Sequence, residues 1–347
     1  MSIGAAVLMI FMMPHACDPQ LNWWQGSVLL EVGPTPRLDL KQLIADVTAM
    51  QEAGVKGIKL INLYGTSDNL SNENNLIYAN DFDALRVYLD DLRDITVLAS
   101  TLHSANMKLL VEIPTISPNS TVEPELDFKI TKAIQFWAES GVDGIGLMGL
   151  QNYAGDRYLT DRVSAWATDF EKFSPNSQRI LFTSYLLPEN IGSSNLSLPV
   201  TGSEAVTRFN LLDAGLSMTD NQNFSNLQED ILRANRWDKA PSSPWILWHG
   251  LVQDRPTGAQ LAFQIFLPGT ISLPRSVLTH SMPEPNQTGA QPNSTNSSQN
   301  NSSLLLPQLI EARKHAVPLY MNGNYKVRLY SYYFQNVSQL FTLSLCH

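Results

Sequence analysis

Short apolar runs alternate along the chain with longer segments in which apolar residues recur every three or four positions. The apolar runs predict buried strands at 23–32, 55–63, 108–113, 142–147, 179–185, 214–219 and 245–251, and an eighth that begins near 270. The periodic segments predict helices at 39–53, 82–104, 131–140, 157–173, 206–212, 224–235, 258–267 and 305–317. Eight strands alternating with helices predict an α/β fold, a (β/α)8 TIM barrel.

Capping residues support the ends of several of these helices. Asp39 precedes the first helix, with Gln42 three residues further on, and Gly54 follows its end. Gly141 is placed to adopt the left-handed conformation that ends a helix before the strand at 142–147. Near the carboxyl terminus, 325–334 and 339–345 alternate apolar and polar side chains, which predicts an antiparallel hairpin.

Composition and charge narrow the class of protein. Of the 347 residues, 44% are hydrophobic and 16% are charged, which is typical of a globular protein with a large core. The net charge of −9 argues against a surface that binds nucleic-acid phosphates. The tract 283–303 is rich in Asn, Ser, Pro and Gln and predicts a disordered loop.

Two features indicate a chain that enters the secretory pathway. The uncharged run Ile3–Met13 is too short to span a bilayer. It could be a signal-peptide core, the outer half of a signal anchor, or a buried strand. Glycosylation sequons, which favour a lumenal or extracellular chain, occur at Asn69, Asn119, Asn195, Asn223, Asn286, Asn293, Asn296, Asn300, Asn301 and Asn336.

The chain has two cysteines, Cys17 and Cys346, at its opposite ends. Two cysteines do not make a disulfide framework. The spacing leaves open a free thiol, a bridge between the two, and a bridge to another chain.

The segment Gly-Val-Asp-Gly at 141–144 resembles the segment that carries the nucleophile in α-amylase-type glycoside hydrolases. By that resemblance Gly146 stands where the family has Arg, and Met148 where it has the nucleophilic Asp. Tyr185 stands in the place of the general acid, and Leu251, or Gly250 in the other alignment, in the place of the third acid. A retaining glycosidase needs two carboxyl groups, so these substitutions predict a barrel without catalytic activity.

The family that keeps this frame without its catalytic residues comprises the heavy-chain subunits of heteromeric amino-acid transporters, and the chain resembles their ectodomains. The resemblance rests on Cys17 followed by the Trp23-Trp24 pair, on the step at 54–58, and on Leu-Pro-Gly-Thr at 267–270. Only 114–130 separate the third strand from the next helix, so the shorter branch without the insertion domain fits best.

This resemblance implies a non-catalytic ancillary subunit that brings a polytopic light chain to the plasma membrane and supports amino-acid transport. It implies a disulfide from Cys17 to that light chain, a single-pass type II anchor, an extracellular barrel, and neither cofactor nor metal. The expected domains are a partial anchor at 1–16, a neck at 17–22, the barrel at 23–318 with its disordered loop 283–303, and a truncated β domain at 319–347.

The sequence also allows two other functions. An active glycoside hydrolase with displaced carboxylates would use Glu112 together with Glu189 or Asp254, although Glu112 is more readily explained as a paired structural residue. A sugar-binding barrel without a partner would use the four tryptophans Trp23, Trp24, Trp245 and Trp248. His249 is either the remnant of the amylase motif on the seventh strand or a packed core residue.

Overall fold

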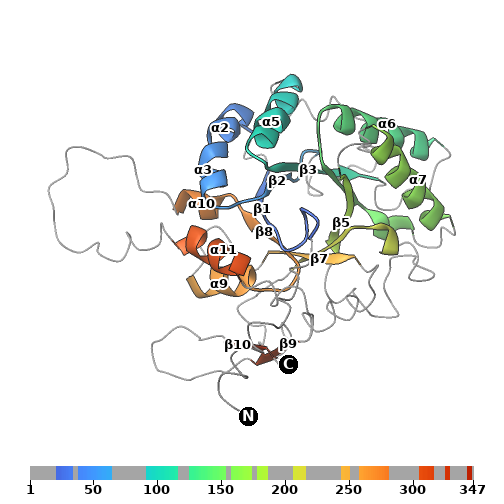
Figure 1. Cartoon of the computed structure of the whole chain (residues 1–347). Coiled ribbons are helices and arrows are strands. Elements are labelled where there is room, and N and C mark those ends of the chain that lie inside the picture. The colour runs from blue at the N-terminus through green and yellow to red at the C-terminus, as the bar shows by residue number, and fades with distance from the viewer. Residues whose placement is uncertain are drawn as a thin grey trace, which may run out of the picture.

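Eight parallel strands close into a barrel in which each strand pairs with the next and the eighth pairs with the first (Figure 1). The computed structural model describes residues 21–33, 38–64, 91–115, 125–153, 158–173, 178–186, 206–215, 244–250, 258–280, 305–315, 325–328 and 342–345. The strands are β1 (Val28–Val32), β2 (Gly57–Leu60), β3 (Lys108–Pro114), β4 (Gly144–Met148), β5 (Ile180–Leu186), β6 (Leu211–Gly215), β7 (Trp245–His249) and β8 (Thr270–Pro274).

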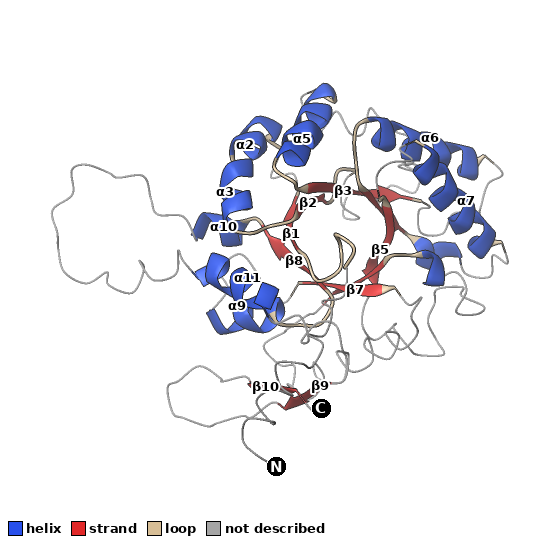
Figure 2. Ribbon diagram, in the orientation of Figure 1, coloured by secondary structure: helices blue, strands red, loops and turns tan. Residues whose placement is uncertain are grey.

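The described helices lie outside the strands and cover much of the barrel, as Figure 2 shows. They are α2 (Leu40–Ala45), α3 (Val47–Glu52), α5 (Arg93–Ser104), α6 (Leu126–Glu139), α7 (Leu159–Lys172), α9 (Gly258–Ile265), α10 (Ser276–His280) and α11 (Leu305–His315). The main core lies between strands and helices and contains Ile58, Val111, Ile145 and Trp248. The predicted (β/α)8 barrel is therefore confirmed.

A second, smaller core fills the inside of the barrel. Leu29, Leu110, Ile180, Phe182, Leu211 and Leu247 alternate along their strands with the outward-facing residues, and Trp24 joins them. Parallel barrel strands are buried on both sides, which is why these segments are almost continuously apolar. A charged residue within such a run must therefore find its partner inside the barrel.

The helix ends follow the predicted capping residues with one difference. The Asp39 carboxylate accepts a hydrogen bond from the Gln42 backbone N–H at 2.9 Å, and Gly54 and Gly141 have φ angles of 86° and 91°. The predicted helix 39–53 is divided at Asp46 into α2 and α3. The Asp46 carboxylate pairs with Arg275, which follows β8, so the turn between α2 and α3 lies against the end of β8.

The prediction for the sixth strand is wrong. A helix at 206–212 and a strand at 214–219 were expected, but a short 3-10 turn, η4 (Val206–Arg208), precedes β6 at Leu211–Gly215. Asn210 fixes this start because its side-chain oxygen accepts the Leu181 N–H of β5 at 3.0 Å. The predicted helix 224–235 lies outside the described residues. The short helix α10 was not predicted, and α6 begins earlier than expected.

Arg313 of α11 joins the segments that precede the first and the last strand of the barrel. Its guanidinium donates to the carbonyls of Gly26 at 3.0 Å and Leu267 at 2.8 Å, and also to those of Ile265 and Gly269. The side chain is buried, and a buried guanidinium is stable only with such a set of acceptors. The segment before β1 and the segment before β8 are thus held by one residue of the last barrel helix.

Beyond the barrel, β9 (Tyr325–Arg328) and β10 (Thr342–Leu345) pair antiparallel, as the alternating pattern predicted. Within the described part of the chain, no helix has both the length and the apolar character needed to cross a bilayer. The expected anchor at 1–16, residues 17–20 of the expected neck at 17–22, both cysteines and all ten sequon asparagines lie outside the described residues.

Candidate functional site

Five ionisable side chains meet inside the barrel near the carboxyl ends of its strands. They come from five different strands and are Glu31 of β1, Lys59 of β2, Glu112 of β3, Asp213 of β6 and His249 of β7. Glu31 is the register partner of Lys59, and Glu31, Glu112, Asp213 and His249 each share the inward side of their strand with an interior core residue. We name these five residues the interior charge cluster.

Lys59 is the centre of this cluster. Its Nζ lies 2.6 Å from Asp213 Oδ2, 3.1 Å from Glu31 Oε1 and 3.1 Å from Glu112 Oε1. The Lys59 amine also lies 5.7 Å from the centre of the Phe182 ring. One ammonium group therefore serves three carboxylates.

His249 extends the cluster toward solvent. Its Nδ1 pairs with Asp213 Oδ1, so the two oxygens of Asp213 contact His249 and Lys59 respectively. The side chains of Lys59, Glu112 and Asp213 are at most 1% exposed, whereas those of Glu31 and His249 are 15% and 13% exposed. A ligand at the mouth of the barrel would meet Glu31 and His249 first.

The cluster keeps Lys59, Asp213 and His249 charged despite burial. Burial alone would lower the pKa of Lys59, but the charges of Asp213, Glu112 and Glu31 outweigh it, so this pKa lies well above its ordinary value. Burial would raise the pKa of Asp213, but His249 and Lys59 bring it below its ordinary value. Burial would lower the pKa of His249, and Asp213 raises it above its ordinary value.

These charge states limit the chemistry that the cluster can perform. A lysine nucleophile must lose its proton, so the raised pKa of Lys59 argues against a Schiff-base role. The Glu112 and Asp213 carboxylate oxygens that contact Lys59 lie within about 6 Å of each other, because both touch the same nitrogen. Retaining glycosidases hold their two carboxyl groups about 5 to 5.5 Å apart. The two acids are thus no farther apart than about 6 Å, and the Lys59 ammonium group lies between them.

The fourth strand carries two of the substituted positions, Gly146 and Met148. Gly146 faces Phe182, and a Cβ added to Gly146 would lie 2.4 Å from the Phe182 ring, so any larger residue would collide with it. Met148, at the carboxyl end of β4, is partly buried, and its carbonyl accepts hydrogen bonds from both the backbone N–H and the hydroxyl of Thr115. The ring of Phe182 fills the space that a side chain at 146 would take.

The other predicted site positions are described only in part. Tyr185 lies within β5, and Gly250 follows β7 with a φ angle of 87°. Leu251 lies outside the described residues, as do Glu189 and Asp254 of the displaced-carboxylate alternative. Glu112 is paired, as expected, although its partner Lys59 comes from a neighbouring strand rather than from nearby in sequence.

The four tryptophans do not gather at the mouth of the barrel. Trp24 and Trp248 are buried in the interior and outer cores respectively. Trp23 precedes β1 and Trp245 begins β7, so both lie toward the amino ends of the strands. Trp23 donates through Nε1 to the Gln178 carbonyl at 2.9 Å. The geometry gives no support to a tryptophan platform for sugar at the carboxyl ends.

Lys59, Glu31 and Asp213 were missed in the sequence, although a signal was present. Each is a single charged residue within an otherwise apolar strand: Val-Leu-Leu-Glu-Val, Gly-Ile-Lys-Leu and Leu-Leu-Asp-Ala-Gly. Such residues inside two-sided strands predict buried ion pairs. The part of the chain that the structure describes contains no group of three or more His, Cys, Asp or Glu side chains arranged to hold a metal ion.

The fold is similar to those of several solved structures. A point mutant of trehalulose synthase MutB is 10% identical, with a TM-score of 0.60, and the match covers 89% of this chain and 87% of that chain. Isomaltulose synthase from Klebsiella sp. LX3 is 10% identical, with a TM-score of 0.53 and coverages of 88% and 73%. The maltogenic α-amylase AmyB from Thermotoga neapolitana is 11% identical, with a TM-score of 0.51 and coverages of 87% and 79%. No protein-family model and no curated protein sequence matches the chain.

The barrel therefore has the α-amylase-like (β/α)8 fold. These three structural neighbours are α-amylase-family enzymes, at identities that show the fold alone. The prediction that the barrel is not an enzyme is contradicted, because it rested on substituted motif positions whereas these three neighbours are glycoside hydrolases and synthases.

Proposed function

We propose that this chain is a carbohydrate-active protein of the α-amylase type that receives an α-linked sugar at the carboxyl ends of its barrel strands. The observation that carries the proposal is the interior charge cluster, whose carboxylates lie at the end of the barrel where active sites of this fold are built. The sugar-converting enzymes among the structural neighbours support the choice of substrate class.

The cluster suggests how its residues would share this work. Glu31 and His249 reach solvent and would contact the sugar, with His249 held by Asp213. Lys59 contacts both Glu112 and Asp213, and together with His249 it keeps Asp213 ionised. A protonated imidazole can give its proton to a leaving oxygen, which is the role of a general acid.

The test uses purified protein with sucrose, maltose and maltotriose, following both binding by calorimetry and product formation. We expect saturable binding or turnover by about 10 mM sugar, above the usual range of Michaelis constants. Glu31→Gln and His249→Gln should each reduce the signal at least about tenfold, since each removes a group that the sugar would contact. Asp169→Asn, on the outer helix α7, is the matched control and should leave it unchanged. Absence of both binding and turnover in a folded wild-type protein would refute this function.

A second function is favoured by a different observation, the Trp23-Trp24 pair that precedes β1. We propose, from the sequence resemblance, that the chain is the heavy-chain ectodomain of a heteromeric amino-acid transporter and is joined to its light chain through Cys17. The support is Trp23 and Trp24, which contact each other edge to face with ring centres 5.7 Å apart and lie against the barrel. Thr270 donates to the Trp24 carbonyl at 2.5 Å, so this pair is tied to the start of β8.

Chain connectivity makes this second function testable. Six residues of extended chain span at most about 20 Å, so a partner bound to Cys17 must approach the end of the barrel that carries Trp23. Co-expression with candidate light chains followed by a non-reducing gel should give a high-mass band that Cys17→Ser abolishes. Cys346→Ser should leave the band in place. If no such band forms, covalent attachment through Cys17 is disproved.

A further inference from the structure

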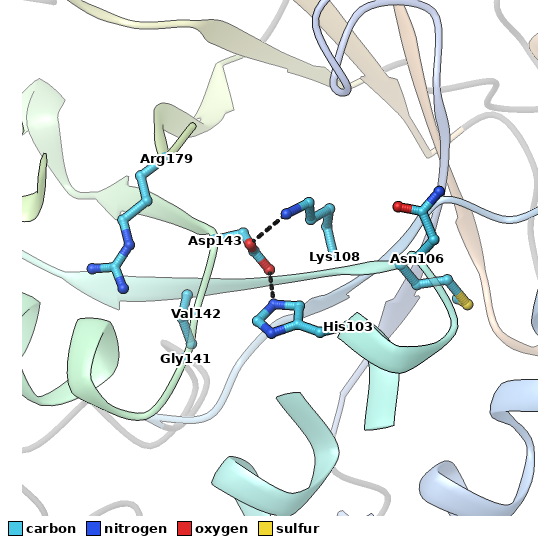
Figure 3. A pocket seen from close by; sticks show the side chains of 8 residues that line it. His103, Asn106, Lys108, Gly141, Val142, Asp143 and Arg179 are labelled. Atoms are coloured by element: carbon cyan, nitrogen blue, oxygen red, sulfur yellow. Dashed lines mark hydrogen bonds and ion pairs between the residues drawn. The ribbon is translucent and has the colours of Figure 1, made fainter. Parts of the chain in front are cut away.

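A polar pocket of about 270 Å3 opens at the amino ends of β3, β4 and β5, at the opposite end of the barrel from the interior charge cluster. It is lined by His103, Asn106, Met107, Lys108, Gly141, Val142, Asp143 and Arg179. Figure 3 shows Lys108 and His103 turned toward Asp143, with Arg179 on the other side of it. Asp143 belongs to the Gly-Val-Asp-Gly segment, so this residue has a place in the fold far from the mouth of the barrel.

The acceptors of Asp143 are already occupied. Its Oδ1 accepts from Lys108 Nζ at 2.9 Å, and its Oδ2 lies 2.8 Å from His103 Nε2 and accepts from the Leu109 N–H at 3.0 Å. Burial would raise the pKa of Asp143, but His103, the Leu109 N–H and Lys108 bring it below its ordinary value. The carboxylate is 3% exposed and remains ionised, so Lys108 neutralises it.

The walls of the pocket also carry hydrogen-bond donors that Asp143 does not occupy. Lys108 carries three N–H groups, of which Asp143 takes one. Arg179 donates through Nη2 to the Ala138 carbonyl at 2.8 Å and through Nη1 to the Phe170 carbonyl at 3.2 Å. Its Nε is buried and has no acceptor among the described residues. Burial lowers the pKa of Arg179 and outweighs the charge of Asp143, which raises it.

Asn106 adds an exposed carboxamide to the same wall. Its φ angle of 55° places it in the left-handed region, where Asn is tolerated better than most residues. Its backbone N–H donates to the His103 carbonyl at 2.9 Å, and this turn, which ends α5, leads into Lys108. The side chain is exposed and lines the pocket, where a ligand can reach it.

We propose that this pocket binds a small oxyanion, a ligand with a carboxylate or phosphoryl group. Lys108 and Arg179 outnumber the single carboxylate of Asp143, so the pocket has a positive balance in a chain whose net charge is −9. The oxyanion would accept hydrogen bonds from Lys108, Asn106 and Arg179, which have donors to spare. Charge-assisted bonds of this type are the strong ones at protein surfaces.

Titration calorimetry at constant ionic strength tests the proposal, with inorganic phosphate and sulfate in one arm and acetate and citrate in the other. We expect saturable binding of at least one probe, and the two arms decide between phosphoryl and carboxylate sources. Lys108→Gln removes a cation and should weaken the binding constant at least about tenfold, as expected for loss of a charge-assisted bond.

Asn106→Gly is the second variant and does not threaten the fold, because glycine accepts the positive φ angle at no cost. Binding should weaken about three- to tenfold, the usual effect of one neutral hydrogen bond. Asn62→Gly is the matched control: Asn62 has a φ angle of 56° but follows β2 at the other end of the barrel. Equal binding by wild type, Lys108→Gln and Asn106→Gly would overturn the proposal, and so would absence of binding by every probe at about 10 mM.

Discussion

Replacing Lys59 with methionine removes the only positive charge that contacts Glu31, Glu112 and Asp213 together among the described residues, and it nearly conserves side-chain length. Breaking a buried ion pair from one side costs about 3 to 5 kcal/mol, because a charge is left without its partner. We expect one of the two fully buried acids, Glu112 or Asp213, to take up a proton instead. Protonating a carboxyl group of ordinary pKa at pH 7 costs about 4 kcal/mol.

This mechanism fixes how the loss depends on pH. The native Lys59→Met protein binds one more proton than its unfolded state above pH 4, so its free energy of unfolding falls by about 1.4 kcal/mol per pH unit relative to wild type. The loss should be about 1.5 kcal/mol at pH 5 and about 4 kcal/mol at pH 7. Urea unfolding, followed by tryptophan fluorescence at both pH values, measures these differences.

The control is Lys314→Met, which removes an exposed lysine that pairs with Glu311 at 2.8 Å. Surface pairs contribute at most about 1 kcal/mol, so this variant should stay close to wild type at both pH values. A loss for Lys59→Met that is equal at pH 5 and pH 7 would refute proton uptake by the buried acids. A loss below about 1 kcal/mol at pH 7 would show that Lys59 is not the centre of the cluster.

Three further predictions follow from single contacts. Gly146→Ala should lower the free energy of unfolding by about 1 to 3 kcal/mol because its Cβ meets the Phe182 ring, and Phe182→Leu in the same chain should restore part of the loss in urea unfolding. Because the pKa of His249 is raised, its contribution to stability is complete below about pH 6.5 and is lost as the pH rises through the folded-state pKa. In thermal melts, His249→Gln should therefore lower the stability more at pH 6 than at pH 9. Equal losses at the two pH values would contradict the pairing with Asp213. Because the pKa of Asp143 is lowered, its contribution to the free energy of unfolding is present above about pH 4 and is lost below it. Asp143→Asn should therefore lower the stability at pH 7, and this loss should shrink toward pH 3. A loss that is the same at every pH would show that charge is not the cause.

The barrel could be predicted from sequence because its determinants are local. Two-sided apolar runs, the Asp39 cap and the left-handed Gly54 and Gly141 are each visible within a few residues. The sixth strand was misplaced because 206–219 contains apolar residues at both spacings, and its start depends on the contact of Asn210 with Leu181. No pattern within the segment reports that contact.

The site could be predicted only in part, for a related reason. The substituted positions Gly146 and Met148 could be compared directly with a family motif, whereas the interior charge cluster unites residues up to 218 positions apart in sequence, from Glu31 to His249. Only closure of the barrel brings them together. A single charge in an apolar strand predicts that a partner exists, but not which strand supplies it.

The contacts of Arg313 have a consequence for the synthesis of this chain on the ribosome. The strand β1 is synthesised early, whereas its second neighbour β8 and Arg313, which joins the segments before these two strands, are synthesised much later. Thr270, for example, lies 246 residues after its acceptor Trp24. Through most of translation the nascent strand therefore offers an open edge to other chains, a state that invites aggregation. We expect this edge to need protection from other chains until β8 and then Arg313 have left the exit tunnel.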